Sequence, residues 1–77
     1  MNIQQLRYVV AIANSGTFRE AASKLFVSQP SLSVAVRELE KELGFLIFTR
    51  TTTGTVLTSQ GMAFYEKALE VKNHNVD

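Results

Sequence analysis

Residues 28–37, which read SQPSLSVAVR, combine side chains that suit binding to a nucleic acid. An amide can bridge two hydrogen-bonding atoms of a base, and apolar side chains can contact a thymine methyl group. Hydroxyl and guanidinium groups bind phosphate oxygens. The candidate DNA-binding residues in this segment are Ser28, Gln29, Pro30, Ser31, Ser33, Val34 and Arg37. For the three serines, helix capping and solubility are the alternative roles.

A helix over residues 29–43 would present these side chains on one side. Ser28 is a favourable N-cap, and Pro30 falls in the first turn, where a missing N–H costs little. At about 100° per residue, one stripe of the wheel is apolar and contains Leu32, Ala35, Val36, Leu39 and Leu43. The opposite face carries Pro30, Ser33, Val34, Arg37 and Lys41. We therefore predict that the leucines face inward and that this opposite face is exposed.

A second helix precedes this one at close distance. Thr17 followed by Glu20 is a capping-box pattern, which predicts a helix from Thr17 to Leu25 or Phe26. Only Val27 and Ser28 would then separate the two helices, so residues 17–43 are predicted to form a helix-turn-helix. A further helix, residues 3 to about 13, is predicted before it, with Asn2 and Gln5 as a capping box and Gly16 near its end.

A short β-hairpin is predicted after the long helix, over residues 46–57. Leu46 to Arg50 alternates apolar and polar residues, Thr55 to Leu57 forms a partner strand, and Gly54 suits the loop. By its position the hairpin is the wing of a winged helix-turn-helix. Arg50 is its only charge, and two roles remain open for it: contact with phosphate, or bracing of the hairpin. Thr53, at the loop tip, is a further candidate DNA contact.

Thr58 is predicted to cap a last helix whose apolar arc covers about half of the wheel. An arc of this width exceeds what one packing contact needs, so we expect one edge to pair with a second copy of the chain. The candidate dimer residues are Phe64, Tyr65, Ala68 and Leu69, with Gly61 and Ala68 allowing close approach. The alternative is that the helix is buried only within its own domain.

This order of elements resembles the DNA-binding domain of LysR-type transcriptional regulators. The resemblance rests on SQPSLSVAVRELEKELG, on a strand ending in FTR and on a further strand ending in LT, and it covers residues 1 to about 71. It implies a mainly α winged helix-turn-helix at residues 1–57, with a three-helix core and a two-stranded β wing, followed by a linker and dimerisation helix at residues 58–77. It also implies sequence-specific binding of double-stranded DNA, with the recognition helix 29–43 in the major groove.

The resemblance carries three further expectations. A homodimer would bind a partly palindromic operator in the cytoplasm, at the nucleoid. A small-molecule inducer would bind only a C-terminal domain beyond this fragment. Members of the family often carry a basic residue at the position of Val34 and another near Thr53, and this sequence has neither. Val34 therefore predicts a preference for an A·T pair, and the wing tip lacks the cation that would enter a minor groove.

Composition limits the other classes of function. The 77 residues suit one small domain, and the net charge is only +1. No cysteine is present, which excludes disulfides and cysteine-ligated zinc, and we expect no cofactor in this fragment and no membrane segment. The only histidine is His74 and the only aspartate is Asp77, so we expect no enzyme. A winged-helix module that binds another protein remains the alternative.

Overall fold

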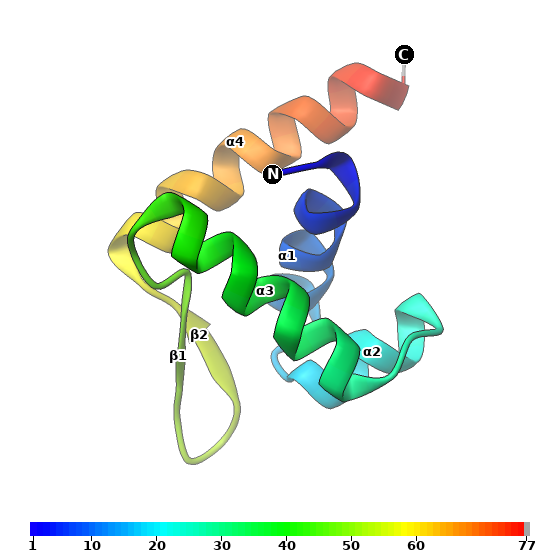
Figure 1. Ribbon diagram of the computed structural model, residues 1–77, viewed down its shortest axis with the longest axis vertical. Coiled ribbons are helices and arrows are strands. Elements are labelled where there is room, and N and C mark those ends of the chain that lie inside the picture. Colours follow the sequence, from blue (N-terminus) through cyan, green and yellow to red (C-terminus); the bar gives the residue numbers. More distant parts are fainter. Residues whose placement is uncertain (77) are drawn as a thin grey trace.

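The computed structural model describes the backbone of residues 1–76 and the side chains of residues 1–71, so the predicted side-chain positions of His74 and Asp77 lie outside it. The helices are α1 (Ile3–Ser15), α2 (Phe18–Leu25), α3 (Gln29–Leu43) and α4 (Ser59–Val76), and the strands are β1 (Phe48–Arg50) and β2 (Thr55–Leu57). In Figure 1, α3 crosses in front of α1, the β-hairpin hangs beside α3, and α4 closes the opposite end. None of the helices in the described part is both long and apolar enough to span a bilayer.

Side chains that bind free backbone amides begin the first three helices. The Asn2 side chain accepts from Gln5 N at 2.8 Å, and Gln5 Oε1 accepts from Asn2 N at 3.0 Å, which completes the predicted capping box of α1. Ser28 Oγ caps α3 by accepting from Ser31 N at 3.1 Å. The predicted box at Thr17 forms only in part. Thr17 Oγ1 accepts from Glu20 N, whereas the Glu20 carboxylate lies 4.0 Å from Lys24 Nζ.

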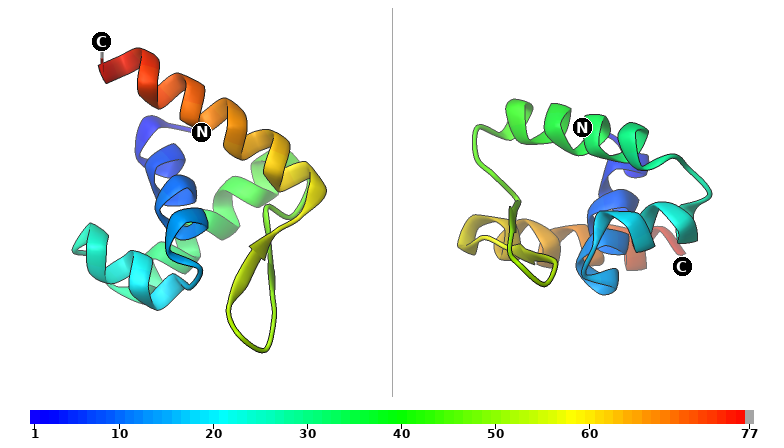
Figure 2. Two further views of the ribbon diagram at one scale, coloured as in Figure 1. Left: turned by 180° about the vertical axis from the view of Figure 1, so that it is seen from behind. Right: turned by 90° about the horizontal axis from the view of Figure 1, so that it is seen from below.

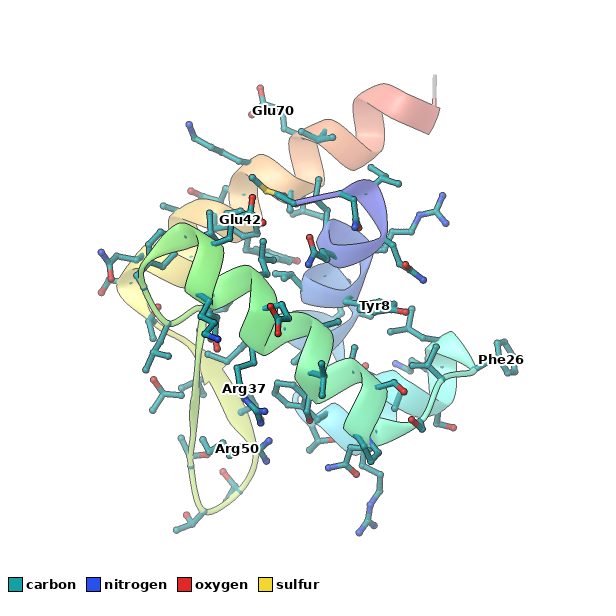
Figure 3. The ribbon with its side chains drawn as sticks, in the orientation of Figure 1. Tyr8, Phe26, Arg37, Glu42, Arg50 and Glu70 are labelled. Atoms are coloured by element: carbon teal, nitrogen blue, oxygen red, sulfur yellow. The ribbon has the colours of Figure 1, made fainter. Side chains whose placement is uncertain are left out.

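The turn between α2 and α3 is one residue longer than predicted. Phe26 adopts a left-handed conformation, with φ 59°, and its N–H bonds back to Ala22 O and Ser23 O. The helix therefore ends at Leu25, and Phe26, Val27 and Ser28 form the turn. The Phe26 side chain is 94% exposed and points away from the molecule (Figure 3).

The core lies where α1, α2 and α3 meet the base of the hairpin. Its fully buried side chains include Val9 and Ile12 of α1, Leu32 and Leu39 of α3, and Ile47. The inward orientation predicted for the leucine stripe of α3 is thus confirmed for Leu32 and Leu39, while Leu43 is half-buried. The view from below in Figure 2 shows α3 as one layer over the layer of α1, α2 and α4.

The hairpin pairs antiparallel, with Phe48 opposite Leu57 and Arg50 opposite Thr55. Its first strand begins two residues later than the predicted Leu46. The physical reason is that the preceding backbone binds other partners: Ile47 N donates to Glu40 Oε2 at 2.7 Å, and Ile47 O accepts from Thr58 N at 2.9 Å. The start of the wing is therefore bonded to α3 on one side and to the start of α4 on the other.

The first turn of α4 packs directly on this segment. A Cβ atom added at Gly61 would overlap the carbonyl oxygen of Ile47. The predicted use of Gly61 as a low point for a partner chain is therefore wrong, because its missing side chain is needed inside this chain.

We expect Gly61→Ala to lower the melting temperature. In an open helix this change would stabilise by about 0.5–1 kcal/mol, but here the new methyl group meets backbone, and overpacking of this kind costs about 1–3 kcal/mol. Circular dichroism during heating measures the difference. Gln60→Ala, at the exposed neighbouring position, should change stability by less than about 0.5 kcal/mol. Equal stability of Gly61→Ala and the parent chain would contradict the packing described for this glycine.

Candidate nucleic-acid interface

The outer face of α3 is open to solvent. Leu32, Val36 and Leu39 are 0–4% exposed, whereas Val34 is 51% exposed. Six of the seven candidate residues are exposed, and Ser33 is half-buried; the exposed ones are Ser28, Gln29, Pro30, Ser31, Val34 and Arg37. The helix therefore presents an amide, apolar groups, hydroxyls and a cation on one surface, as the sequence predicted.

Hydroxyl groups at the start of α3 are already linked to one another. Ser28 Oγ accepts from the Ser31 amide and donates to Ser31 Oγ at 2.7 Å. The cap leaves Ser31 Oγ free to donate its own proton outward. Ser28 thus has the structural role that the sequence left open, and Ser31 is the better placed of the two hydroxyls for an external acceptor.

A cleft separates α3 from the hairpin. This wing cleft has a volume of about 150 Å³ and is lined by Phe18, Ser33, Val36, Arg37, Glu40, Phe48 and Arg50. Arg37 enters from α3 and Arg50 from β1, and in Figure 3 both side chains extend into the space between these elements. Among residues 1–71, no carboxylate lies within 4.0 Å of either guanidinium. Within the described side chains, Arg37 and Arg50 thus have no ion-pair partner, and Glu40 is the one acidic residue that lines the same cleft.

A second hollow lies on the other side of Arg50. This loop hollow has a volume of about 400 Å³ and is lined by Thr17, Phe18, Arg19, Gln29, Arg50, Thr51, Gly54 and Thr55. It connects the first turn of α2, the first residue of α3 and the wing loop. Arg19, the second residue of α2, therefore lies beside two candidate residues, Gln29 and Arg50.

The wing has a defined position because its loop bonds to the turn between α1 and α2. Thr55 N donates to Gly16 O at 2.8 Å, and a Cβ added at Gly54 would lie 2.5 Å from the same oxygen. Thr53, exposed at the loop, carries no charge. Gly54 is thus required for the close approach of the wing loop to Gly16.

The sequence did not predict that Phe18, Arg19 and Glu40 would belong to this surface. Glu40 of α3 is half-buried and does not lie on a solvated helix face. Its Oε2 accepts from Ile47 N at 2.7 Å and from Phe48 N at 3.3 Å, which fixes the first wing residues against α3. Only its position one helical turn after Val36, on the edge of the apolar stripe, could have indicated such a role.

The candidate dimer residues have different surroundings. Ala68 is 1% exposed within the single chain, so the prediction that it offers close approach to a partner is wrong, because its own chain already buries it. Tyr65 donates its hydroxyl to Asn14 Oδ1 of α1 at 2.9 Å. Phe64 and Leu69 are half-buried.

An open apolar hollow of about 530 Å³ lies beside α4. This apolar hollow is lined by Met1, Leu6, Leu43, Phe45, Gln60, Ala63, Phe64, Lys67, Ala68 and Val71. Phe64 and Ala68 contribute to it, whereas Tyr65 and Leu69 lie elsewhere on the helix. The surface left for a partner is therefore one flank of α4 together with residues of α1 and of the end of α3.

Comparison with known proteins gives the family. The model of the bacterial regulatory helix-turn-helix protein, lysR family, matches residues 3–62. HTH-type transcriptional regulator BudR of Klebsiella aerogenes is 45% identical over 71 residues, covering 92% of this chain and 50% of BudR. The DNA-binding transcriptional dual regulator OxyR of Escherichia coli is 44% identical over 71 residues, covering 92% of this chain and 23% of OxyR. The chain thus spans half or less of the length of these relatives.

Solved structures agree over almost the whole chain. The CbnR DNA-binding domain in complex with DNA superposes with a TM-score of 0.92 at 36% identity, covering 97% of this chain and 86% of that one. The BenM DNA-binding domain on benA site 1 DNA gives a TM-score of 0.92 at 35% identity, covering 96% of this chain and 83% of that one. The predicted fold class, a mainly α winged helix-turn-helix, is confirmed. This chain belongs to the LysR family of bacterial transcription regulators and carries its helix-turn-helix DNA-binding domain.

Proposed function

We propose that α3 enters the major groove of double-stranded DNA and reads part of an operator sequence. The observation that carries this proposal is the exposed outer face of α3, where the side chains of Gln29, Val34 and Arg37 are open to solvent. An α-helix fits the major groove, and its first turns reach the base edges in helix-turn-helix proteins. The CbnR and BenM complexes with DNA, which share this fold, support the assignment.

Base contacts are assigned to the first two turns of α3. The Gln29 amide is suited to bridge N6 and N7 of adenine, and Pro30 and Val34 provide apolar surface for a thymine methyl group. Because valine cannot donate to guanine, the pair opposite Val34 is proposed to be A·T. Each good base contact is worth roughly 1–3 kcal/mol of discrimination.

Phosphate contacts are assigned to residues around these bases. The proposed contacts are Ser28 at the N-cap of α3, Ser31, Ser33 and Arg37 within α3, and Arg50 and Thr53 of the wing. Ser28 would act through its backbone at the helix N-terminus, since its hydroxyl is bonded to Ser31. Arg37 and Arg50 lie on the two walls of the wing cleft, so both can approach the same side of a duplex.

A homodimer on a partly palindromic site completes the proposal. One small domain contacts few base pairs, and two copies related by a two-fold axis double the length of DNA that is read. The apolar hollow beside α4 supports an interface on that flank, with Phe64 among its lining residues. The whole protein is proposed to act on the nucleoid in the cytoplasm. A small-molecule inducer would bind a further domain of it.

The second candidate function is a winged-helix module that binds another protein, which a net charge of only +1 allows. An electrophoretic mobility shift with random duplex DNA at low salt separates the two. A DNA-binding domain retards the duplex and releases it at high salt, whereas a protein-binding module leaves it unshifted. An unshifted duplex at every protein concentration would reject the proposed function.

Val34→Arg is expected to change the preferred base pair. Arginine donates to O6 and N7 of guanine, so the preferred base pair opposite residue 34 should change from A·T to G·C. The preference for G·C should be roughly 1–3 kcal/mol. In vitro selection of bound duplexes measures the preference. Gln4→Arg adds the same charge at an exposed position of α1 and should leave the selected sequence unchanged. An unchanged sequence for Val34→Arg as well would contradict the contact proposed for Val34.

Arg37→Ala is expected to weaken binding to all duplexes by a similar factor. Loss of one phosphate contact should reduce the slope of log K against log salt by about 0.9 per subunit. Fluorescence anisotropy at several salt concentrations gives this slope. Arg7→Ala removes an exposed arginine of α1 and is the matched control, with an unchanged slope expected. Equal slopes for the two variants would remove Arg37 from the interface.

Ala63→Glu is expected to dissociate the dimer, because it places a charge at the exposed rim of the apolar hollow, where a partner would exclude water. Sedimentation velocity measures the loss of the dimer. Ser59→Glu, which adds the same charge at the exposed start of α4 outside the hollow, should leave association unchanged. If Ala63→Glu sediments like the parent chain, the interface lies elsewhere.

A further inference from the structure

Arg50 is held against an aromatic ring. Its guanidinium carbon Cζ lies 4.9 Å from the centroid of the Phe18 ring, within the distance at which a cation and a ring face attract. Phe18 itself is 7% exposed and is the first residue of α2, directly after the N-cap Thr17. Its ring packs edge-to-face with Phe48, with centroids 5.8 Å apart and an interplanar angle of 77°. The ring is therefore fixed by the core on one side and offers a rigid surface to Arg50 on the other.

The Phe18–Arg50 pair lies between the two polar hollows of the DNA-facing surface. Phe18 and Arg50 are the two residues that line both the wing cleft and the loop hollow. Arg37 lies in the first of these hollows, and Arg19 and Gln29 lie in the second. A guanidinium that rests on a ring with its face keeps its N–H donors available for a further acceptor.

We propose that Phe18 is a positioning residue for DNA binding, which holds the guanidinium of Arg50 where a backbone phosphate can accept from it. Arg50 is the single charged residue of the wing, residues 46–57, so the electrostatic contribution of the wing depends on this one side chain. A long side chain on a two-stranded hairpin loses rotamer freedom when it binds, and prior stacking on Phe18 removes part of that loss. This inference rests on the proposed function, because it needs Arg50 to contact DNA.

The alternative is that Phe18 only fills the core. Both roles predict that truncating Phe18 lowers stability, so stability cannot distinguish them. They differ in how Phe18 and Arg50 depend on each other. If Phe18 acts through Arg50, its replacement has no further effect on DNA binding once Arg50 is absent.

The experiment is a double-mutant cycle on the 77-residue chain, with duplex affinity measured by fluorescence anisotropy at a temperature where circular dichroism shows every variant folded. Arg50→Ala should weaken binding roughly tenfold. Phe18→Leu, which keeps apolar bulk but removes the ring face, should weaken it roughly two- to tenfold. In the Arg50→Ala background, Phe18→Leu should change affinity less than about twofold. With Arg50 present, Phe18→Tyr, which keeps the ring, should bind nearly as well as the parent chain. Val9→Ala, the truncation of a fully buried side chain of α1, controls for general destabilisation.

Each outcome supports or overturns a defined statement. A parent chain that fails to bind any duplex rejects the proposed function itself. If the parent chain and Phe18→Leu bind duplex DNA with equal affinity while Arg50→Ala binds it weakly, the positioning role of Phe18 is rejected. The proposed DNA binding is not affected by that result. Equal losses from Phe18→Leu in both backgrounds also reject it, since they show a role in the fold alone. If Phe18→Leu does not fold, Phe18→Met replaces it in the same cycle.

Discussion

Burial of one stripe of α3 is the constraint on which the rest of the structure depends. Leu32, Val36 and Leu39 are almost completely buried, and each such side chain contributes roughly 1.5–3 kcal/mol relative to exposure. Rotation of α3 about its axis would return them to water, so the helix has one stable orientation. Because side chains on a helix are fixed relative to one another, that orientation also sends Gln29 and Val34 outward. The core of this domain and its candidate DNA-reading surface are thus two sides of one helix.

The wing is positioned by contacts from three elements. Glu40 of α3 binds the amides of Ile47 and Phe48, Thr58 at the start of α4 binds the carbonyl of Ile47, and Gly16 binds the amide at position 55. A two-stranded hairpin alone has little stability in water, so these contacts determine its position. They also bring Arg50 to the cleft opposite Arg37. Local clustering of this kind compensates for a net charge that is close to zero.

The last helix contributes to the domain as well as to its proposed assembly. Gly61 packs on the start of the wing, and Ala68 is buried against the domain, so the first three turns of α4 belong to the same folded unit as α1. The flank of α4 that remains open is apolar and continues onto α1 and the end of α3. A partner bound there would contact α3 near its C-terminal end. The position of the second copy would therefore be coupled to the orientation of α3.

The amino-acid sequence alone determined the four helices, their caps at Asn2 and Ser28, the exposed face of α3 and the family. These features follow from periodicity, from capping chemistry over three or four residues, and from motif spacing, all of which are local. Tertiary structure alone decided that Gly61 and Ala68 face inward, that the first strand starts at Phe48, and that Phe18 supports Arg50. Each of these depends on contacts between residues far apart in the chain. A helical wheel shows which residues share a face, but it does not show which neighbour that face will meet.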